Sequence, residues 1–281
     1  MIDAHHHLWD TAARDYPWLS GAAMAPLRRP YGLADLRRGC AARGVEHTVL
    51  VQTVGETAET EEFLATAAAS DGLVAGVVGW VDLTAPDVAG ELMRLRSLPG
   101  GELLVGIRHP VQGETDPKWL YREDVRHGVR AVGQAGLAYD LLVLAHQLPA
   151  ARDLVRDLPG MRFVLDHAAK PPIASGAVEP WASEIKALAA SPNVMCKLSG
   201  LVTEADWHDW DAPRLAPYAE HVLGCFGTDR VMFGSDWPVC ELAASYEQVV
   251  DLARELTAGL SAAERELVFA GNARVAYDLP S

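Results

Sequence analysis

The sequence predicts an α/β fold of the (β/α)8-barrel, or TIM-barrel, class. Short runs rich in Val, Leu and Ile alternate along the chain with longer amphipathic segments, as expected for βα units around a parallel sheet. Eight such units can be counted, and residues able to perform chemistry stand at the C-terminal ends of several predicted strands, which form the catalytic face of this fold. At 281 residues the chain has the length of a single barrel enzyme, so we expect one domain over residues 1–281.

The predicted strands are short and apolar, as expected for strands buried on both faces. Their periodicity does not by itself separate a closed barrel from a doubly wound open sheet, but the order and number of the units favour the barrel. The eight strands are predicted at Ile2–His7, His47–Val54, Val74–Val81, Leu103–Arg108, Tyr139–His146, Arg162–His167, Val194–Ser199 and Arg230–Asp236.

The segments between the strands have a hydrophobic period close to 3.6 and are predicted to be helices. Ser261 and Glu264 have the spacing of a capping box, which predicts a last helix running through Val268 and closing the barrel floor. Residues Tyr16–Tyr31 form a long loop that we expect to overhang the active face. The outer helices are predicted at Leu33–Arg43, Ala58–Ala69, Asp87–Ser97, Arg122–Gln134, Ala150–Asp157, Pro180–Ala190, Arg214–Phe226 and Tyr246–Thr257.

The charge of the chain disfavours two classes of partner. The formal net charge is -14, whereas binding to nucleic acid or to an anionic membrane surface requires clustered Lys and Arg. No apolar run approaches the roughly 18 residues of a membrane span. The four cysteines are far apart in the sequence and form no C-x-x-C pair. We therefore expect a cytoplasmic protein that acts on a small molecule; the sequence leaves open whether it forms a homo-oligomer.

The first predicted strand ends in three consecutive histidines. Alternate residues of a strand point to the same side, so His5 and His7 share one face while His6 points to the other. Two imidazoles separated by about 6 to 7 Å along one strand face can bind one cation.

Three further predicted strands end in His146, His167 and Asp236. Taken singly, each has an ordinary structural explanation, because a histidine at a strand end is often only hydrogen-bonded and an Asp before a turn is often a helix cap. In a barrel, however, all of these side chains meet at one rim. Their combination predicts a shared site on strands one, five, six and eight.

These residues resemble a known family. The pattern His5-x-His7, then His146, His167 and Asp236, is similar to that of the amidohydrolase superfamily, whose members are barrels of the metal-dependent hydrolase type. The phrases FVLDHAAKP at 163–171, CKLSG at 196–200 and FGSDWP at 233–238 look like the amidohydrolase-2 lactonase branch. That branch includes fuconolactonases, rhamnonolactonases, sulfomuconolactone hydrolases and pyrone-dicarboxylate lactonases.

The resemblance also implies a metal, with one departure from the superfamily pattern. Many members have a bridging Lys or Glu at the end of strand four, where this chain has Gly106-Ile107-Arg108-His109-Pro110, so a binuclear site is not expected. The preferred interpretation is one divalent ion bound by His5, His7, Asp236 and His146. Zinc suits this donor set and manganese would also suit it. Members of the branch differ in whether they need a metal, so the resemblance leaves metal-independence open.

Each residue of the group is given a role in lactone hydrolysis. The expected catalytic residues are Asp236, His167 and His146. Asp236 takes a proton from water and returns it to the leaving alkoxide, and His167 stabilises the oxyanion or binds a substrate hydroxyl. His146 is also one of the expected metal ligands. A structural salt bridge is the alternative to substrate binding for Arg108. A place in the apolar core is the alternative for Trp80 and Trp237. The expected substrate-binding residues are Gln52, Trp80, Arg108, His109, Lys197 and Trp237.

A sugar-acid lactone such as L-fuconolactone or L-rhamnonolactone is the expected substrate, which would place the protein in carbohydrate metabolism. A pyrone-dicarboxylate would call for several arginines at the rim, and only Arg108 qualifies. Another lactone hydrolase, of the sulfomuconolactone or pyrone-dicarboxylate type, is the nearest alternative. Two other classes also stay open: a lactone isomerase or metal-dependent decarboxylase on the same barrel, and a catalytically silent binding protein. A silent protein would be expected to lack part of the group, and none of it is missing.

Overall fold

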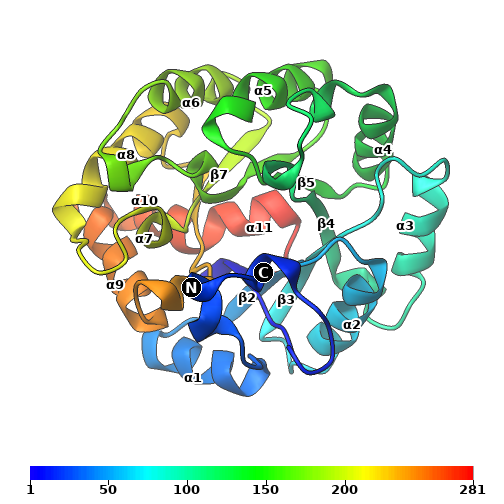
Figure 1. Cartoon of the computed structure of the whole chain (residues 1–281), viewed down its shortest axis with the longest axis horizontal. Helices are drawn as coiled ribbons and strands as arrows, with labels where there is room; N and C mark the ends of the chain where they lie inside the picture. Colours follow the sequence, from blue (N-terminus) through cyan, green and yellow to red (C-terminus); the bar gives the residue numbers. More distant parts are fainter. Residues whose placement is uncertain (281) are drawn as a thin grey trace.

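The computed structural model describes residues 1–280 and contains a ring of eight parallel strands, which Figure 1 views end on. Neighbours in the ring are also neighbours in the sequence, from β1 to β8. The ring closes between β8 and β1 through two backbone hydrogen bonds. The N–H of Asp236 donates to the carbonyl of His5 at 2.8 Å, and the N–H of His7 donates to the carbonyl of Trp237 at 2.7 Å. The barrel prediction is confirmed. The strands are β1 Ile2–His6, β2 His47–Val51, β3 Val74–Gly79, β4 Leu104–His109, β5 Ala138–Leu141, β6 Phe163–Leu165, β7 Val194–Leu198 and β8 Val231–Phe233.

Most predicted strands run too far at their C-terminal ends. The largest error is in β5, which ends at Leu141 rather than at His146. β6 ends at Leu165 and β8 at Phe233, before His167 and Asp236. These two residues adopt left-handed backbone conformations, with φ values of 51° and 57°, which no strand can include. Both of these candidate side chains follow their strands on turns.

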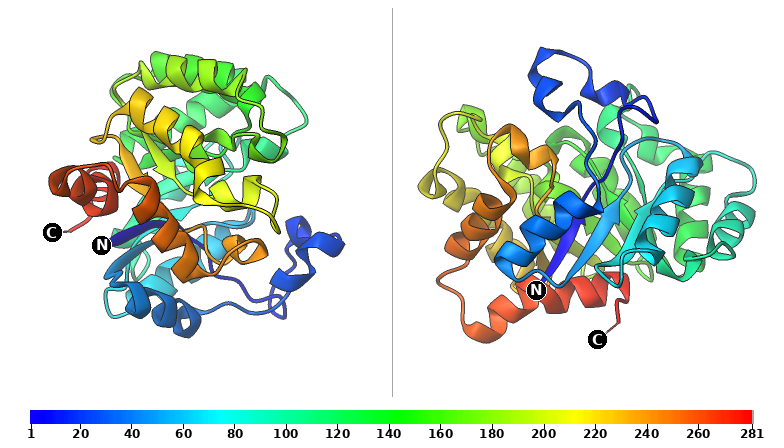
Figure 2. Two further views of the ribbon diagram at one scale, coloured as in Figure 1. Left: turned by 90° about the vertical axis from the view of Figure 1, so that its left-hand side faces the viewer. Right: turned by 90° about the horizontal axis from the view of Figure 1, so that it is seen from below.

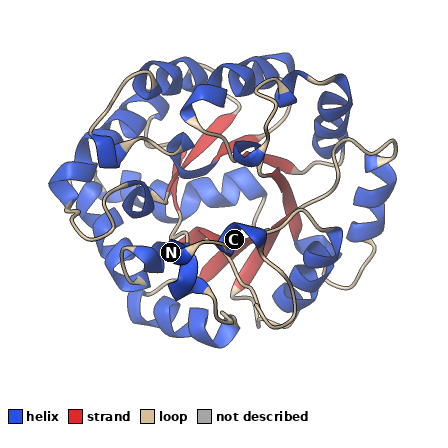
Figure 3. Ribbon diagram, in the orientation of Figure 1, coloured by secondary structure: helices blue, strands red, loops and turns tan. Residues whose placement is uncertain are grey.

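Helices surround the strands on the outside (Figure 3). All eight predicted outer helices are present, and no end differs from its prediction by more than two residues. A short extra helix, α7 at Leu201–Glu204, follows β7. The others are α1 Leu33–Arg43, α2 Thr57–Ala68, α3 Val88–Arg96, α4 Glu123–Gln134, α5 Leu148–Asp157, α6 Trp181–Ala189, α8 Ala212–Phe226 and α9 Tyr246–Leu256.

The C-terminal segment closes one end of the barrel. The capping box is confirmed, since Ser261 Oγ accepts the N–H of Glu264 at the start of α10, Ala262–Glu266. The helical segment does not end at Val268 as predicted. It continues through a π-helical turn, Leu267–Gly271, into α11, Asn272–Tyr277. Figure 1 shows α11 crossing behind the middle of the ring.

The lower interior of the barrel is apolar and packs directly on this closing segment. Its side chains come from alternate, inward-facing strand positions such as Val49, Val78 and Val164, and from Ala273 and Tyr277 of α11. A second, larger apolar cluster lies between the strands and the outer helices. The filled floor leaves the opposite end of the barrel for a site.

The predicted loop between β1 and α1 lies at that opposite end, and Figure 2 shows it projecting away from α11. Two 3₁₀ turns, Pro17–Leu19 and Ala22–Leu27, give it local order. Backbone hydrogen bonds between Trp9 and Tyr31, at 2.8 and 3.2 Å, tie its two ends together. Within residues 1–280, no helix is long and apolar enough to cross a membrane.

Candidate active site

His5 and His7 point into the barrel from β1. The register of β1 against β2 shifts between Asp3 and His6, and such a bulge re-aims a side chain at the rim of a barrel. Asp3 Oδ1 accepts the backbone N–H of His5 at 3.1 Å and so supports the local kink. The Nε2 atoms of His5 and His7 lie 3.1 Å apart, while the ring of His6 turns away to bond Thr48 Oγ1 at 2.9 Å. The predicted alternation of the three histidines is confirmed.

Asp236, which follows β8, lies next to the His5 and His7 pair, because β8 and β1 are neighbours where the ring closes. Its Oδ1 atom is 3.5 Å from His7 Nε2 and 3.8 Å from His5 Nε2. The same oxygen lies 3.8 Å from Nε2 of His167. One carboxylate therefore faces three imidazoles, all of them buried.

His167 reaches the group because of an unusual backbone turn after β6. His167, Ala168, Ala169 and Lys170 all have positive φ, between 48° and 56°. Non-glycine residues in this region carry strain, which tends to be found at functional sites. The ring is held by a hydrogen bond of 2.8 Å between Nδ1 and Ser199 Oγ, so that Nε2 faces Asp236.

Gly200 leaves the space that this ring occupies, and Gly200→Ala tests its placement. A Cβ at position 200 would lie 2.8 Å from His167 Nδ1, and the residue has a φ of +67°. We expect activity to fall about 100-fold, the order of loss caused by a misplacement of about 1 Å. Steady-state kinetics and thermal melting would be measured together.

Gly176→Ala is the matched control for this prediction. Gly176 has nearly the same φ, +68°, but a Cβ there would meet nothing within 4 Å. Both variants should lose roughly 1–2 kcal/mol of stability from the left-handed conformation, and only Gly200→Ala should lose activity. Equal activity in the two variants would show that the position of His167 does not matter.

Burial sets the protonation states of the group. It lowers the pKa of His5 and His7, and it lowers that of His167 to about 4, because a dry surrounding disfavours the imidazolium. Burial works in the opposite direction on Asp236, but His167 and His7 outweigh it, and the pKa of this carboxyl is below its usual value. Neutral imidazoles beside an ionised carboxylate are the forms that bind a metal.

The donor set fits one divalent cation. His5, His7 and Asp236 offer ligand atoms that all lie within 4.8 Å of one another. His7 Nδ1 donates to the carbonyl of Val51 at 2.8 Å, which leaves the Nε2 lone pair directed into the site. Two imidazole nitrogens and one carboxylate, with a position left open, are typical of a catalytic zinc site.

Comparison with known proteins identifies the family. The family model described as amidohydrolase matches residues 2–279. The chain belongs to the amidohydrolase family. It is 39% identical to an L-fucono-1,5-lactonase of Burkholderia multivorans, with 99% of this chain and 96% of the relative covered. It is 41% identical to an L-fucono-1,5-lactonase of Burkholderia ambifaria, with 87% and 82% covered.

A solved structure agrees with this assignment. A crystal structure of an amidohydrolase from Burkholderia multivorans with bound zinc superimposes with a TM-score of 0.93. The two chains are 39% identical, and 99% of each is covered. A relative of this amidohydrolase therefore binds zinc on the same fold.

His146 is the predicted ligand that the structure does not bring to the group. It lies five residues beyond the end of β5, in the 3₁₀ turn Ala145–Gln147, and its side chain is exposed. It belongs to neither of the potential metal-binding groups found among residues 1–280, His5–His7–Asp236 and His5–Asp166–His167. The prediction failed because the apolar run after Leu141 belongs to a loop leading to α5 and does not continue the strand.

A buried charge network that the sequence interpretation did not identify lies below the group. Arg108 of β4 donates to Asp166 Oδ2 at 3.0 Å, and its Nη1 is 3.4 Å from His5 Nε2. Lys197 of β7 lies 2.6 Å from Asp140 Oδ2 and 2.9 Å from Asp166 Oδ1. The available signal was a charged residue inside or directly after each of four otherwise apolar strands, β4 to β7, because such a residue needs a buried partner.

The predicted substrate-binding residues mostly have partners within the protein. Arg108 also donates to the carbonyl of Gln52 and to its Oε1, the latter at 3.3 Å, while Gln52 Nε2 donates to the Arg108 carbonyl. Lys197 is fully buried in the network. The side chains of Arg108, Gln52 and Lys197 therefore bond to other groups of the protein beneath the site.

The aromatic candidates lie on two sides of the rim. Trp80 Nε1 donates to His109 Nδ1 at 3.1 Å, and His109 Nε2 in turn bonds Glu114 at 2.7 Å. The His109 ring stacks on Trp119 with centroids 4.1 Å apart. Trp237 is buried and donates to Glu241 at 2.9 Å. Among these candidates, Trp80 and His109 are only partly buried.

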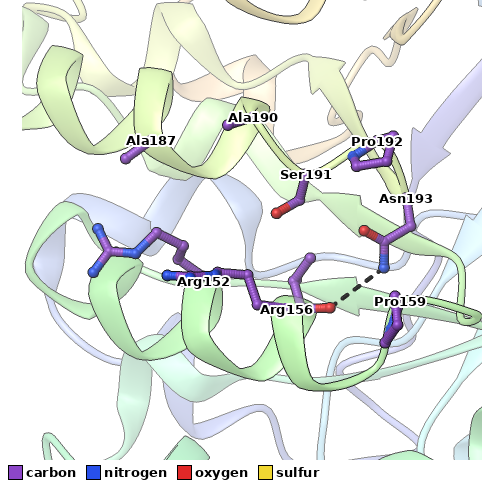
Figure 4. Close-up of a pocket in the computed structure, with 9 residues that line it drawn as sticks. Arg152, Arg156, Pro159, Ala187, Ala190, Ser191, Pro192 and Asn193 are labelled. Carbon is purple, nitrogen blue, oxygen red and sulfur yellow. Dashed lines mark hydrogen bonds between the residues drawn. The ribbon is translucent and has the colours of Figure 1, made fainter.

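One surface groove lies away from this group. Figure 4 shows it between α5 and α6, lined by residues such as Arg152, Arg156 and Asn193. Arg152 already pairs with Glu184 at 3.1 Å. No residue of the His5–His7–Asp236 group lines this groove, so we do not connect it with the chemistry.

Proposed function

We propose that this amidohydrolase is a lactonase that opens the ring ester of a small sugar-acid lactone, with L-fucono-1,5-lactone as the first candidate. The observation that carries the proposal is the 39% identity to an L-fucono-1,5-lactonase over 99% of the chain. The group formed by His5, His7 and Asp236 supports it, because its donor set suits metal-assisted hydrolysis.

We propose zinc as the metal, held by Nε2 of His5, Nε2 of His7 and a carboxylate oxygen of Asp236. When bound there, zinc would polarise the lactone carbonyl and lower the pKa of water from about 15.7 towards 7. Manganese remains the alternative for the same donors. His146 is not part of this proposal because its side chain is exposed outside the group.

Asp236 performs the proton transfers in the proposed reaction. It accepts a proton from the attacking water as the new C–O bond forms, and it returns that proton to the ring oxygen as the ester C–O bond breaks. The product is a hydroxy acid, which releases one proton at neutral pH. The hydroxyl of Ser199 can donate to His167 Nδ1, which keeps a proton on Nε2 for a hydrogen bond to the oxyanion or a substrate hydroxyl.

A neutral, hydroxylated ring fits the surrounding side chains better than a dicarboxylate does. Arg108 is already engaged by Asp166 and Gln52, so it is not free to bind a substrate carboxylate. Lys170 and Glu204, an ion pair at 3.5 Å whose side chains are about one quarter exposed, offer a donor and an acceptor for hydroxyl groups. Trp80, which is partly buried, is proposed to contact the sugar ring as an apolar wall.

Carbohydrate metabolism in the cytoplasm is the proposed setting. All four cysteines are free thiols, which supports a reducing compartment.

The proposal is tested by following proton release with a pH indicator on a panel of aldonolactones. Each reaction is compared with an enzyme-free control, because such lactones also open spontaneously, and is repeated after chelation and zinc or manganese repletion. Catalysed proton release that is lost on chelation and restored by metal is the expected result. Isomerisation without proton release, carbon dioxide release from a carboxylated substrate, or no reaction on any lactone would each contradict the proposal.

A further inference from the structure

The closing helix α11 extends one polar group into the barrel. Tyr277, at its end, is buried among the apolar side chains of the barrel floor. Its hydroxyl donates to Asp140 Oδ2 at 2.6 Å, and its ring centroid lies 5.3 Å from Lys197 Nζ. The floor of the barrel is thus connected to the charge network beneath the site.

Lys197 continues this connection upward. Its Nζ atom lies 2.6 Å from Asp140 Oδ2, 2.9 Å from Asp166 Oδ1 and 3.1 Å from Nδ1 of His5. The contact with Asp140 is a hydrogen bond, whereas the ammonium and Asp166 Oδ1 form an ion pair without hydrogen-bond geometry. A continuous chain of contacts therefore runs from Tyr277 through Asp140 and Lys197 to His5.

The members of this chain of contacts are closed off from solvent. The side chains of Asp140, Asp166, Lys197 and His5 are all fully buried. Asp140 Oδ1 has no hydrogen-bond partner among the described residues, so Tyr277 and Lys197 at Oδ2 are the contacts that hold this carboxylate. A dry, partly satisfied carboxylate that loses one donor is expected to rearrange.

We propose that Tyr277 is a positioning residue of the active site, which fixes Asp140 and thereby the ammonium of Lys197 against Nδ1 of His5. For Nε2 of His5 to keep the lone pair that a metal needs, the ring proton must be on Nδ1, where Asp166 Oδ1, 3.3 Å away, is the neighbouring acceptor. The Nε2 atom then faces His7 and Asp236. The kinetic consequence rests on the proposed lactonase function, whereas the positioning itself rests only on the contacts. The C-terminal helix then does more than close the barrel, because it orders the site from below.

Tyr277→Phe removes the hydroxyl and keeps the ring. Partners that orient a metal-binding histidine typically contribute 10- to 100-fold, so we expect kcat to fall about tenfold while KM stays within about twofold. Tyr139→Phe is the matched control, since Tyr139 is also fully buried, neighbours Asp140 in the sequence, and has a hydroxyl without a partner. It should keep kcat unchanged.

A second control separates positioning from loss of stability. Asn272 anchors α11 by donating to the carbonyls of Thr228 and Val231 at 2.8 and 2.6 Å, and neither of these hydrogen bonds involves the charge network. Asn272→Ala should lower the melting temperature but keep kcat below the melting range. An equal loss of kcat in Asn272→Ala and Tyr277→Phe would show that α11 acts only through stability.

The decisive readout does not depend on turnover. In protein labelled with ¹⁵N-histidine, without substrate or metal, the imidazole shifts of His5 should change in Tyr277→Phe and stay unchanged in Tyr139→Phe. Changed His5 shifts in a protein that opens no lactone would overturn the proposed function and support the positioning. Unchanged His5 shifts and unchanged kcat in Tyr277→Phe would overturn the positioning.

Two further measurements cover a Tyr277→Phe variant that fails to fold. Asp140→Asn keeps the side-chain volume and breaks the same chain, so it should change the His5 shifts in the same way. In the wild type, the buried Lys197 ammonium should give a ¹⁵N signal protected from solvent exchange, and its absence would contradict the chain of contacts.

Discussion

Asp236→Asn is expected to lower kcat by about 10²- to 10⁴-fold, the contribution of a general base that also serves as the acid. The amide has the same shape but cannot accept the proton of the attacking water. It also removes the negative charge that Oδ1 places within 3.8 Å of His5, His7 and His167. The measurement is proton release on the best aldonolactone, together with melting and circular dichroism of the variant.

Asp229→Asn is a matched control for this substitution. Asp229 is exposed and precedes β8 at its other end, so the same chemical change there should leave kcat unaltered. Full turnover by a folded Asp236→Asn protein would remove Asp236 from the mechanism. A loss confined to KM would make it a binding residue instead.

His7→Asn is expected to abolish most of the metal binding and to lower activity more than about 100-fold. The change removes one of the two imidazoles whose Nε2 atoms lie 3.1 Å apart, and loss of a direct ligand should exceed the 10- to 100-fold effect typical of its supporting partners. Zinc content per chain after dialysis measures occupancy. Chelation and zinc repletion should restore activity in the wild type and not in the variant.

His6→Asn on the same strand provides the comparison. His6 faces away from the site and bonds Thr48, so this variant should lose stability while it keeps its zinc. Zinc retained by His7→Asn, or activity in the wild type that survives complete chelation, would contradict a catalytic metal at this pair. The chemistry would then rest on Asp236 and the histidines alone.

Much of the fold was predictable because its signals are local. The period of apolar residues along each helix and strand depends only on near neighbours, and it located the eight outer helices to within two residues. The alternation of side chains on a strand separated His5 and His7 from His6, as the structure confirms. The capping box at Ser261 was equally local.

Other features depended on contacts between distant segments. The apolar run before His146 looks like a strand, but the backbone stops pairing at Leu141, and periodicity cannot show where pairing stops. Asp140 was missed because a single carboxylate in an apolar segment gives no sign of its partners. Lys197 and Tyr277 are 57 and 137 residues away from it, and only closure of the barrel brings them together.

By itself, the sequence determined the class of fold and the group of His5, His7, His167 and Asp236, because residue type and spacing along a strand carry that information. Only the tertiary structure decided that His146 lies outside this group, and that Asp140, Asp166 and Lys197 form a buried charge network beneath it. The physical reason is that a buried charge is stable only with a buried partner, and the folded chain chooses that partner.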